Sequence, residues 1–127
     1  MHKTHILLSV GNQDEKEELL PFIKVASENK NISFYTTEHT HSFLEENKIK
    51  STFVHKLSEP EKRPNISELI SKKSFDYVII IPPKDVTEES TDYTDDEVIR
   101  NTTAEYGIIP ITDVEVAKII LGNLGSN

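Results

Sequence analysis

Short apolar runs alternate with longer amphipathic stretches along this chain. Five of the runs are rich in β-branched residues, and a nearly continuous apolar run of this length is typical of a strand covered on both faces. The predicted strands are His5–Val10, Ile32–Thr36, Thr52–His55, Asp76–Pro82 and Ile108–Ile111. The run Asp76–Pro82 is the strongest of them, so we expect it to lie centrally in a sheet.

The amphipathic stretches predict a helix after each strand. In four of them a serine, threonine or asparagine stands three residues before a glutamate, a pattern that caps a helix N-terminus. The predicted helices are Asp14–Lys30, Ser42–Asn47, Asn65–Lys73, Thr94–Gly107 and Thr112–Gly122. Pro21 interrupts the first of them. Because proline has no N–H to donate, we expect the regular helix to begin near Pro21 or to kink there.

Strands that alternate with helices specify a parallel sheet with right-handed crossovers and helices on both faces. We therefore predict an α/β fold, a three-layer α/β/α sandwich with a five-stranded parallel sheet, as one domain over residues 1–127. The segment Pro83–Tyr93 is acidic and nearly devoid of apolar residues. A loop of this length in a compact domain is either flexible or a lid, and we favour a flexible loop.

The composition narrows the class of partner. A formal net charge of -8 argues against a nucleic-acid or anionic-membrane surface, because both require a basic face. The chain has no cysteine, which excludes disulfides, thiolate catalysis and cysteine-based zinc sites. No apolar run approaches the roughly 20 residues of a membrane span. We expect a soluble protein of the cytoplasm, with the mitochondrion as the alternative location.

The junction between the second strand and the next helix is the strongest candidate for a binding site. Four hydroxyl side chains crowd it, those of Thr36, Thr37, Thr40 and Ser42. A helix N-terminus offers unpaired N–H donors and the positive end of a dipole, and the carboxyl edge of a parallel sheet is where ligands usually bind. This junction therefore predicts a site for a small anionic molecule.

Two further residues, Lys56 and Gly11, stand at the same predicted edge of the sheet. Lys56 ends the third strand, where it could neutralise an anion, and the spacing is equally compatible with a surface lysine. Gly11 follows the first strand, where it could admit a ligand, although a turn is the commoner role.

A zinc site needs three or four convergent ligands, so His39, His41 and His55 are interpreted as solvated or capping residues.

The sequence lacks three motifs that usually identify nucleotide-binding or catalytic sites. The glycines form neither a dinucleotide-binding fingerprint nor a phosphate-binding loop, and no serine occupies a nucleophile elbow. The paired carboxylates stand at helix starts or on polar faces, where nothing buries them and shifts their pKa. We therefore assign no catalytic residue, no metal ligand and no cofactor.

Several segments, in order along the chain, resemble one known family. They are Ile6–Val10, Phe34–Leu44, Lys56–Ile66, Asp76–Ile79, Val98–Thr102 and Gly107–Pro110. This succession resembles the methylglyoxal-synthase-like domain, most closely the version at the C-terminus of the carbamoyl-phosphate synthetase large subunit. The resemblance implies a parallel five-stranded sheet between helices, with an anion site at the carboxyl edge of the strands.

The same resemblance implies a regulatory role. In carbamoyl-phosphate synthetases this domain binds effectors such as uridine or inosine monophosphate, or N-acetylglutamate, and acts on the synthetase domains of pyrimidine or arginine biosynthesis. The effector-contacting threonines fall on Thr37 and Thr40, and the phosphate-binding lysine falls on Lys56. Ser9 and Gly11 are expected to line the floor of the site. Whether the domain forms a homo-oligomer is not determined by the sequence.

Departures from the family pattern leave two alternatives. The family's enzymes carry a glycine-rich threonine loop and a later segment with the catalytic aspartate, and this chain has Thr37–Thr40 and Pro82–Asp85 there instead. We therefore predict a non-catalytic domain, the first alternative being a divergent methylglyoxal synthase acting on dihydroxyacetone phosphate. Regulatory versions place asparagine or threonine where this chain has Ile80–Pro82. The identity of the effector is therefore not determined. The second alternative is an interaction module whose ligand site has decayed.

Overall fold

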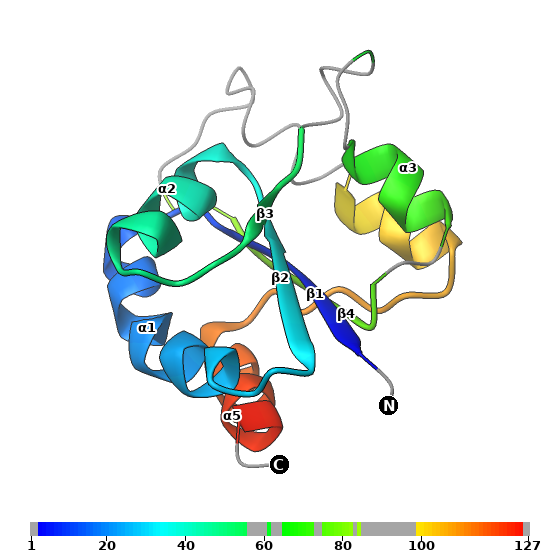
Figure 1. Ribbon diagram of the computed structural model, residues 1–127. Coiled ribbons are helices and arrows are strands. Elements are labelled where there is room, and N and C mark those ends of the chain that lie inside the picture. The colour runs from blue at the N-terminus through cyan, green and yellow to red at the C-terminus, as the bar shows by residue number, and fades with distance from the viewer. Residues whose placement is uncertain are drawn as a thin grey trace.

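A parallel sheet of four strands in the order β3-β2-β1-β4 forms the centre of the molecule (Figure 1). The strands are β1 Thr4–Val10, β2 Ile32–Thr36, β3 Thr52–Phe53 and β4 Tyr77–Ile81. The structure, a computed structural model, describes residues 3–55, 61, 65–72, 75–82, 84 and 99–125. Within them, no helix is long and apolar enough to cross a bilayer.

The predicted fifth strand is reduced to a single parallel bridge between Ile111 and Ile79. The N–H of Ile80 donates to the carbonyl of Ile111, and the N–H of Ile111 donates to the carbonyl of Val78, both at 2.8 Å. Pro110 has no N–H to extend this ladder. β4 therefore has a neighbour on each side, and the parallel α/β prediction is confirmed with a shorter final strand.

Helices cover both faces of the sheet. They are α1 Gln13–Ser27, α2 Glu38–Glu46, α3 Ile66–Ser71 and α5 Val114–Gly125, and residues 99–105 are also helical. Figure 1 shows α1, α2 and α5 on one side of the sheet, with α3 and residues 99–105 on the other. The predicted start of the helix before Gly107, at Thr94, lies outside the described residues, as does the loop Pro83–Tyr93 apart from Lys84.

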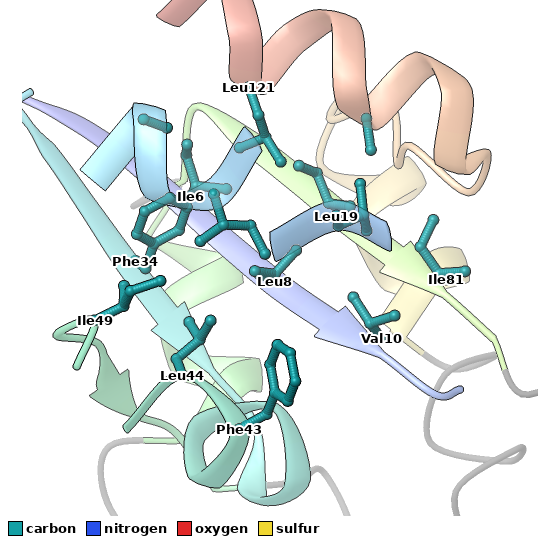
Figure 2. Packing of buried hydrophobic residues seen from close by; sticks show 14 residues of the cluster. Ile6, Leu8, Val10, Leu19, Phe34, Phe43, Leu44, Ile49, Ile81 and Leu121 are labelled. Atoms are coloured by element: carbon teal, nitrogen blue, oxygen red, sulfur yellow. The ribbon is translucent and has the colours of Figure 1, made fainter. Parts of the chain in front are cut away.

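The side chains of β1 divide between two apolar clusters because successive residues of a strand point to opposite faces. Ile6, Leu8 and Val10 pack with α1, α2 and α5, as Figure 2 shows. Leu7 packs with α3 and with Ile99 of the other helical layer. Because both faces of β1 are buried, apolar residues occupy nearly every position of this strand.

The second helix begins at Glu38, one turn before the predicted start at Ser42. Its buried residues are Thr40, Phe43 and Leu44, which lie on one face of a helix at the spacing i, i+3, i+4. Packing of this face against the sheet requires the earlier start. The predicted capping box at Ser42 is therefore wrong, because that residue lies inside the helix.

The first helix also begins earlier than predicted. α1 starts at Gln13 and contains Pro21 at an exposed position. Its buried residues follow one helical face, and they are Lys16, Leu19, Ile23 and Ala26. Burial of this face against the sheet and α5 outweighs the one backbone hydrogen bond that a proline removes. The expectation of a start near Pro21 is wrong, and the alternative of a kink at Pro21 stays a prediction.

The last helix begins at Val114, with Asp113 and not the predicted Thr112 as its cap, and it ends later than predicted. The Asp113 carboxylate accepts hydrogen bonds from the N–H groups of Glu115 at 2.7 Å and Val116 at 3.2 Å, which is a typical N-terminal cap. The helix then continues through Gly122 to Gly125. Gly122 does not end the helix because its neighbour Leu121 is buried against α1 and extends the packed face.

Gly107 does stop the preceding helix, with a φ of +77° that L side chains rarely adopt. Replacement by alanine is expected to lower the free energy of unfolding by about 1–2 kcal/mol. A Cβ at this position would meet no atom within 4 Å, so the loss would come from the backbone alone. Chemical denaturation measures it. Gly122→Ala is the control, since it lies inside α5 with ordinary contacts and is not expected to destabilise.

Candidate functional site

The carboxyl ends of β1 and β2 bring four of the five predicted site residues to one edge of the sheet. Ser9 lies near the end of β1 and Gly11 just beyond it, while Thr37 and Thr40 lie at the start of α2, directly after β2. Side-chain hydrogen bonds connect the two segments. The fifth residue, Lys56, lies outside the described residues.

Thr40 joins the first turn of α2 to β1. Its hydroxyl oxygen accepts a hydrogen bond from the backbone N–H of Val10 at 3.0 Å, and the residue is 2% exposed. A hydroxyl can donate one hydrogen bond besides those it accepts. Thr40 therefore holds the strand and helix together, and its own hydroxyl proton has no acceptor among the described residues.

Thr37 and Ser9 form a second link across the same junction. The Thr37 hydroxyl donates to the Ser9 Oγ at 3.1 Å instead of capping its own helix. The Ser9 proton then has no acceptor within the described part of the chain, and Ser9 is only half-buried. This arrangement leaves the Ser9 hydroxyl as a donor for a molecule bound at the edge.

The N-terminus of α2 leaves backbone donors at this junction. Its first backbone hydrogen bond runs from the N–H of His41 to the carbonyl of Thr37 at 2.7 Å. Among the described residues, no acceptor serves the earlier N–H groups of Glu38, His39 and Thr40. Such groups carry the positive end of the helix dipole and favour an anion.

Gly11 contributes in a different way from the predicted one. Its N–H donates to the carbonyl of Ile81 at 2.8 Å, so this backbone donor extends the pairing of β1 with β4. The residue is exposed and has no side chain that could cover the edge. The observed contact agrees with the turn interpretation and still leaves room for a ligand beside the backbone.

Asn12 organises the edge on the β4 side, and the sequence reasoning missed it. Its amide donates to the carbonyl of Pro82 at 3.1 Å and to the Glu15 carboxylate, while its oxygen accepts from the N–H of Lys84 at 3.0 Å. Asparagine immediately before a helix is a common helix-cap signal in a sequence, although the Asn12 side chain makes no cap hydrogen bond here. The side chain holds the exits of β1 and β4 together.

Lys16 is a second residue that was missed. It is 8% exposed and shares the buried face of α1 with Leu19 and Ile23. A lysine at a core-facing position of an amphipathic helix is unusual, because charged side chains are rarely buried without partners. That pattern in the sequence predicts a buried lysine with a partner, and Lys16 is not without one.

An exposed ion pair borders the site. The Lys84 Nζ lies 2.9 Å from the Asp14 Oδ2, and this hydrogen bond is the main reason why the pKa of Asp14 is below its ordinary value. The same contact raises the pKa of Lys84. Asp14 and Lys84 therefore both stay charged at neutral pH. The positive charge of Lys84 is already paired with the Asp14 carboxylate.

Replacement of Lys84 by methionine is expected to raise the pKa of Asp14 toward its ordinary value. A carboxyl group with a depressed folded pKa contributes stability above its unfolded pKa, and the contribution is lost as the pH falls through the folded value. The variant should therefore lose less stability on acidification than the wild type. An NMR titration of the Asp14 carboxyl carbon measures the shift. An unchanged titration would show that the pair does not persist in solution.

The histidines are used within the fold where their contacts are described. His41 Nδ1 lies 2.8 Å from the Ser51 hydroxyl, and His41 Nε2 lies 3.2 Å from the Glu45 carboxylate. The Phe53 ring stands between those of His41 and His55, with centroid separations of 5.4 and 4.9 Å. The described residues contain no group of three possible metal ligands. His41 and His55 are therefore in contact with neighbouring side chains of the fold.

Comparison with known proteins identifies the family of this chain. The "Multifunctional protein ura1" of Schizosaccharomyces pombe is 25% identical over 122 residues, which make up 94% of this chain and only 5% of that protein. The methylglyoxal synthase of Elizabethkingia anophelis NUHP1 has the same fold, with a TM-score of 0.68 and 18% identity over 94% of this chain and 77% of that one. A family model for the MGS-like domain matches residues 18–112, well over half of the chain. The chain belongs to the MGS-like domain family.

Proposed function

We propose that this chain is a regulatory domain that binds a small anionic metabolite at the carboxyl edge of β1 and β2. The observation that carries the proposal is the start of α2, where free backbone N–H groups stand beside the Ser9 hydroxyl. The N–H groups and the Ser9 hydroxyl are hydrogen-bond donors. The hydrogen bonds that join α2 to β1 hold them in place. Prearranged donors of this kind suit a phosphate or carboxylate group.

Each residue has a defined role in this proposal. The N–H groups of Glu38 and His39 and the hydroxyl of Ser9 donate to the anion. Thr37 orients Ser9, and Thr40 fixes the helix start and donates its remaining proton. The family resemblance adds Lys56 as the source of positive charge.

The proposed ligand is a nucleoside monophosphate or an N-acetylglutamate-like acid, and the proposed role is control of carbamoyl-phosphate synthesis. The domain would act on synthetase domains, which agrees with the small share of a much longer relative that this chain covers. Hydrogen-bond donors by themselves bind an anion and do not transform it. The alternatives, a divergent methylglyoxal synthase and a decayed site, are separated by experiment.

A thermal-shift screen tests the proposal. The panel holds uridine monophosphate, inosine monophosphate, N-acetylglutamate, dihydroxyacetone phosphate and inorganic phosphate. A ligand at 100 times its dissociation constant is expected to stabilise the fold by about 2.7 kcal/mol. No stabilisation by any compound would favour the decayed-site alternative, and turnover of dihydroxyacetone phosphate would favour the enzyme.

A matched pair of serine variants then locates the site. Ser9→Ala is expected to weaken binding of the responding ligand by about tenfold or more, because a hydrogen bond to a charged group contributes roughly 1.5–3 kcal/mol. Ser27→Ala removes an exposed hydroxyl whose bond is to the Lys24 carbonyl at the far end of α1, and it should not change the affinity. Equal affinities of the two variants in calorimetry would remove Ser9 from the site.

A further inference from the structure

A groove lies at the β3 edge of the sheet, away from the site proposed above. It is an open groove of about 770 Å³ beside the first half of β2, the last turns of α2 and the segment that leads into β3. These elements are neighbours in Figure 1. The candidate effector site uses the opposite ends of β2 and α2. The volume falls within the roughly 300–1,000 Å³ typical of small-molecule sites.

Three lysines line this groove. Lys3, Lys48 and Lys50 are all exposed, and within the described residues none of them has an ion-pair partner. Among the other described lysines, Lys72, Lys84 and Lys118 have ion-pair partners, while Lys24 and Lys30 are exposed without one but lie outside the groove. The groove therefore concentrates uncompensated positive charge in a protein whose formal net charge is -8.

Little negative charge opposes these lysines. Glu45 is the only carboxylate among the described residues that line the groove. Its oxygen is 3.2 Å from Nε2 of His41, whose other ring nitrogen is bonded to Ser51. Glu45 is thus already directed toward a histidine, and the lysines are left to interact with a bound anion.

The backbone of Lys48 is an independent sign that this position is special. Lys48 is the only described residue other than glycine with a positive φ, at 62°. It follows the C-cap of α2, where the N–H of Lys48 bonds to the Glu45 carbonyl at 3.0 Å and the N–H of Ile49 bonds to the Leu44 carbonyl at 2.9 Å. Glycine is the usual residue in this motif, because a side chain is strained there. Lysine is therefore unfavourable for the backbone at this position, where glycine would be the usual residue.

The rest of the groove is suited to a compact polar ligand. Ile32, Phe34 and Ile49 contribute apolar surface, while Ser33 and Thr52 contribute hydroxyl groups. Such a mixture of an apolar floor and a few polar groups is typical of metabolite sites. The lysine ammonium groups, on flexible stems, would supply most of the attraction.

We propose that this groove binds a small polyanion, a molecule with at least two phosphate or carboxylate groups, through Lys3, Lys48 and Lys50. The site is separate from the one at the start of α2, and it does not depend on the function proposed for that site. The strained Lys48 is present for its charge and not for the stability of the helix end.

The test uses tripolyphosphate as the probe and calorimetry at low ionic strength, where charge interactions are least screened. Lys48→Gly is expected to weaken binding at least tenfold while the melting temperature stays the same or rises, because glycine suits the left-handed backbone. Lys50→Gln should weaken binding by a similar factor. Lys24→Gln, on the exposed surface of α1, is the control for a general loss of charge.

Three outcomes would overturn the proposal. Unchanged affinity in both Lys48→Gly and Lys50→Gln would show that the groove lysines do not hold the anion. An equal loss in Lys24→Gln would show a non-specific charge effect. Loss of tripolyphosphate binding in Ser9→Ala, with the lysine variants unaffected, would place the anion at the other site. Amide NMR shifts at Ser33 and Thr52 on addition of the probe would support the groove directly.

Discussion

Truncation of Leu44 to alanine is expected to lower the free energy of unfolding by about 3 kcal/mol, the largest stability effect that we predict. Leu44 is 0% exposed and packs with Phe43, Ile49 and Phe34 where α2 meets the sheet, as Figure 2 shows. Removal of the side chain loses its transfer free energy and leaves a cavity in a densely packed region. The same helix carries the proposed effector site at its other end.

Urea denaturation of the wild type and the Leu44 variant measures this loss. Val25→Ala is the control, because Val25 is 43% exposed on α1 and its truncation should change the stability by much less. A Leu44→Ala protein with wild-type stability would mean that α2 does not pack against the sheet as described. Weaker effector binding in the same variant would indicate that the packing also positions the helix start.

Replacement of Thr40 by alanine is expected to affect both stability and binding. The buried N–H of Val10 would lose its acceptor, and an unsatisfied buried donor costs about 1–3 kcal/mol. Effector affinity should fall by roughly 1–2 kcal/mol as well, because the variant lacks one hydroxyl donor to a charged group. Denaturation and calorimetry measure the two losses separately.

Thr40→Ser is the matched control, since serine keeps the hydroxyl and removes only a methyl group. It should retain most of the stability and most of the affinity. If the serine variant is as impaired as the alanine variant, the methyl group and not the hydroxyl is responsible. If alanine changes the stability alone, Thr40 supports the helix start without contacting the effector.

The strands and the fold class could be predicted because they depend on local patterns. The apolar runs at β1 and β4 are long enough to show that both faces are buried, and alternation with helices then leaves few arrangements of the sheet. The final strand was overestimated, because a run such as Ile108–Ile111 is apolar whether it pairs along its length or at one residue. Ile109 in fact is 87% exposed.

Helix starts were less predictable, since a local capping signal competes with packing. The pattern at Ser42 is a plausible cap, but the helix begins at Glu38 and its buried face includes Thr40. Pro21 would likewise shorten α1 if the helix were isolated. Contacts with the sheet and α5 supply more free energy than these local preferences, so the helix extends through the proline.

The threonines at the start of α2 and the residues after β1 were visible in the sequence as candidates for an anion site, because hydroxyl groups gather there at a strand-to-helix junction. Their partners were not visible. Thr40 contacts Val10, and Thr37 contacts Ser9, across about thirty residues of sequence. Asn12 and Lys16 were missed for the same reason, since their significance depends on the elements packed around them.

The amino-acid sequence by itself determined the alternation of strands and helices, the acidic character of the chain and the segment that offers hydroxyl groups to an anion. These properties follow from residue type and local spacing. Only the tertiary structure decided which donors remain free at the start of α2, and that Lys3, Lys48 and Lys50 line one groove. Both depend on which segments pack side by side, because hydrogen-bond partners and shared surfaces form between residues far apart in the chain.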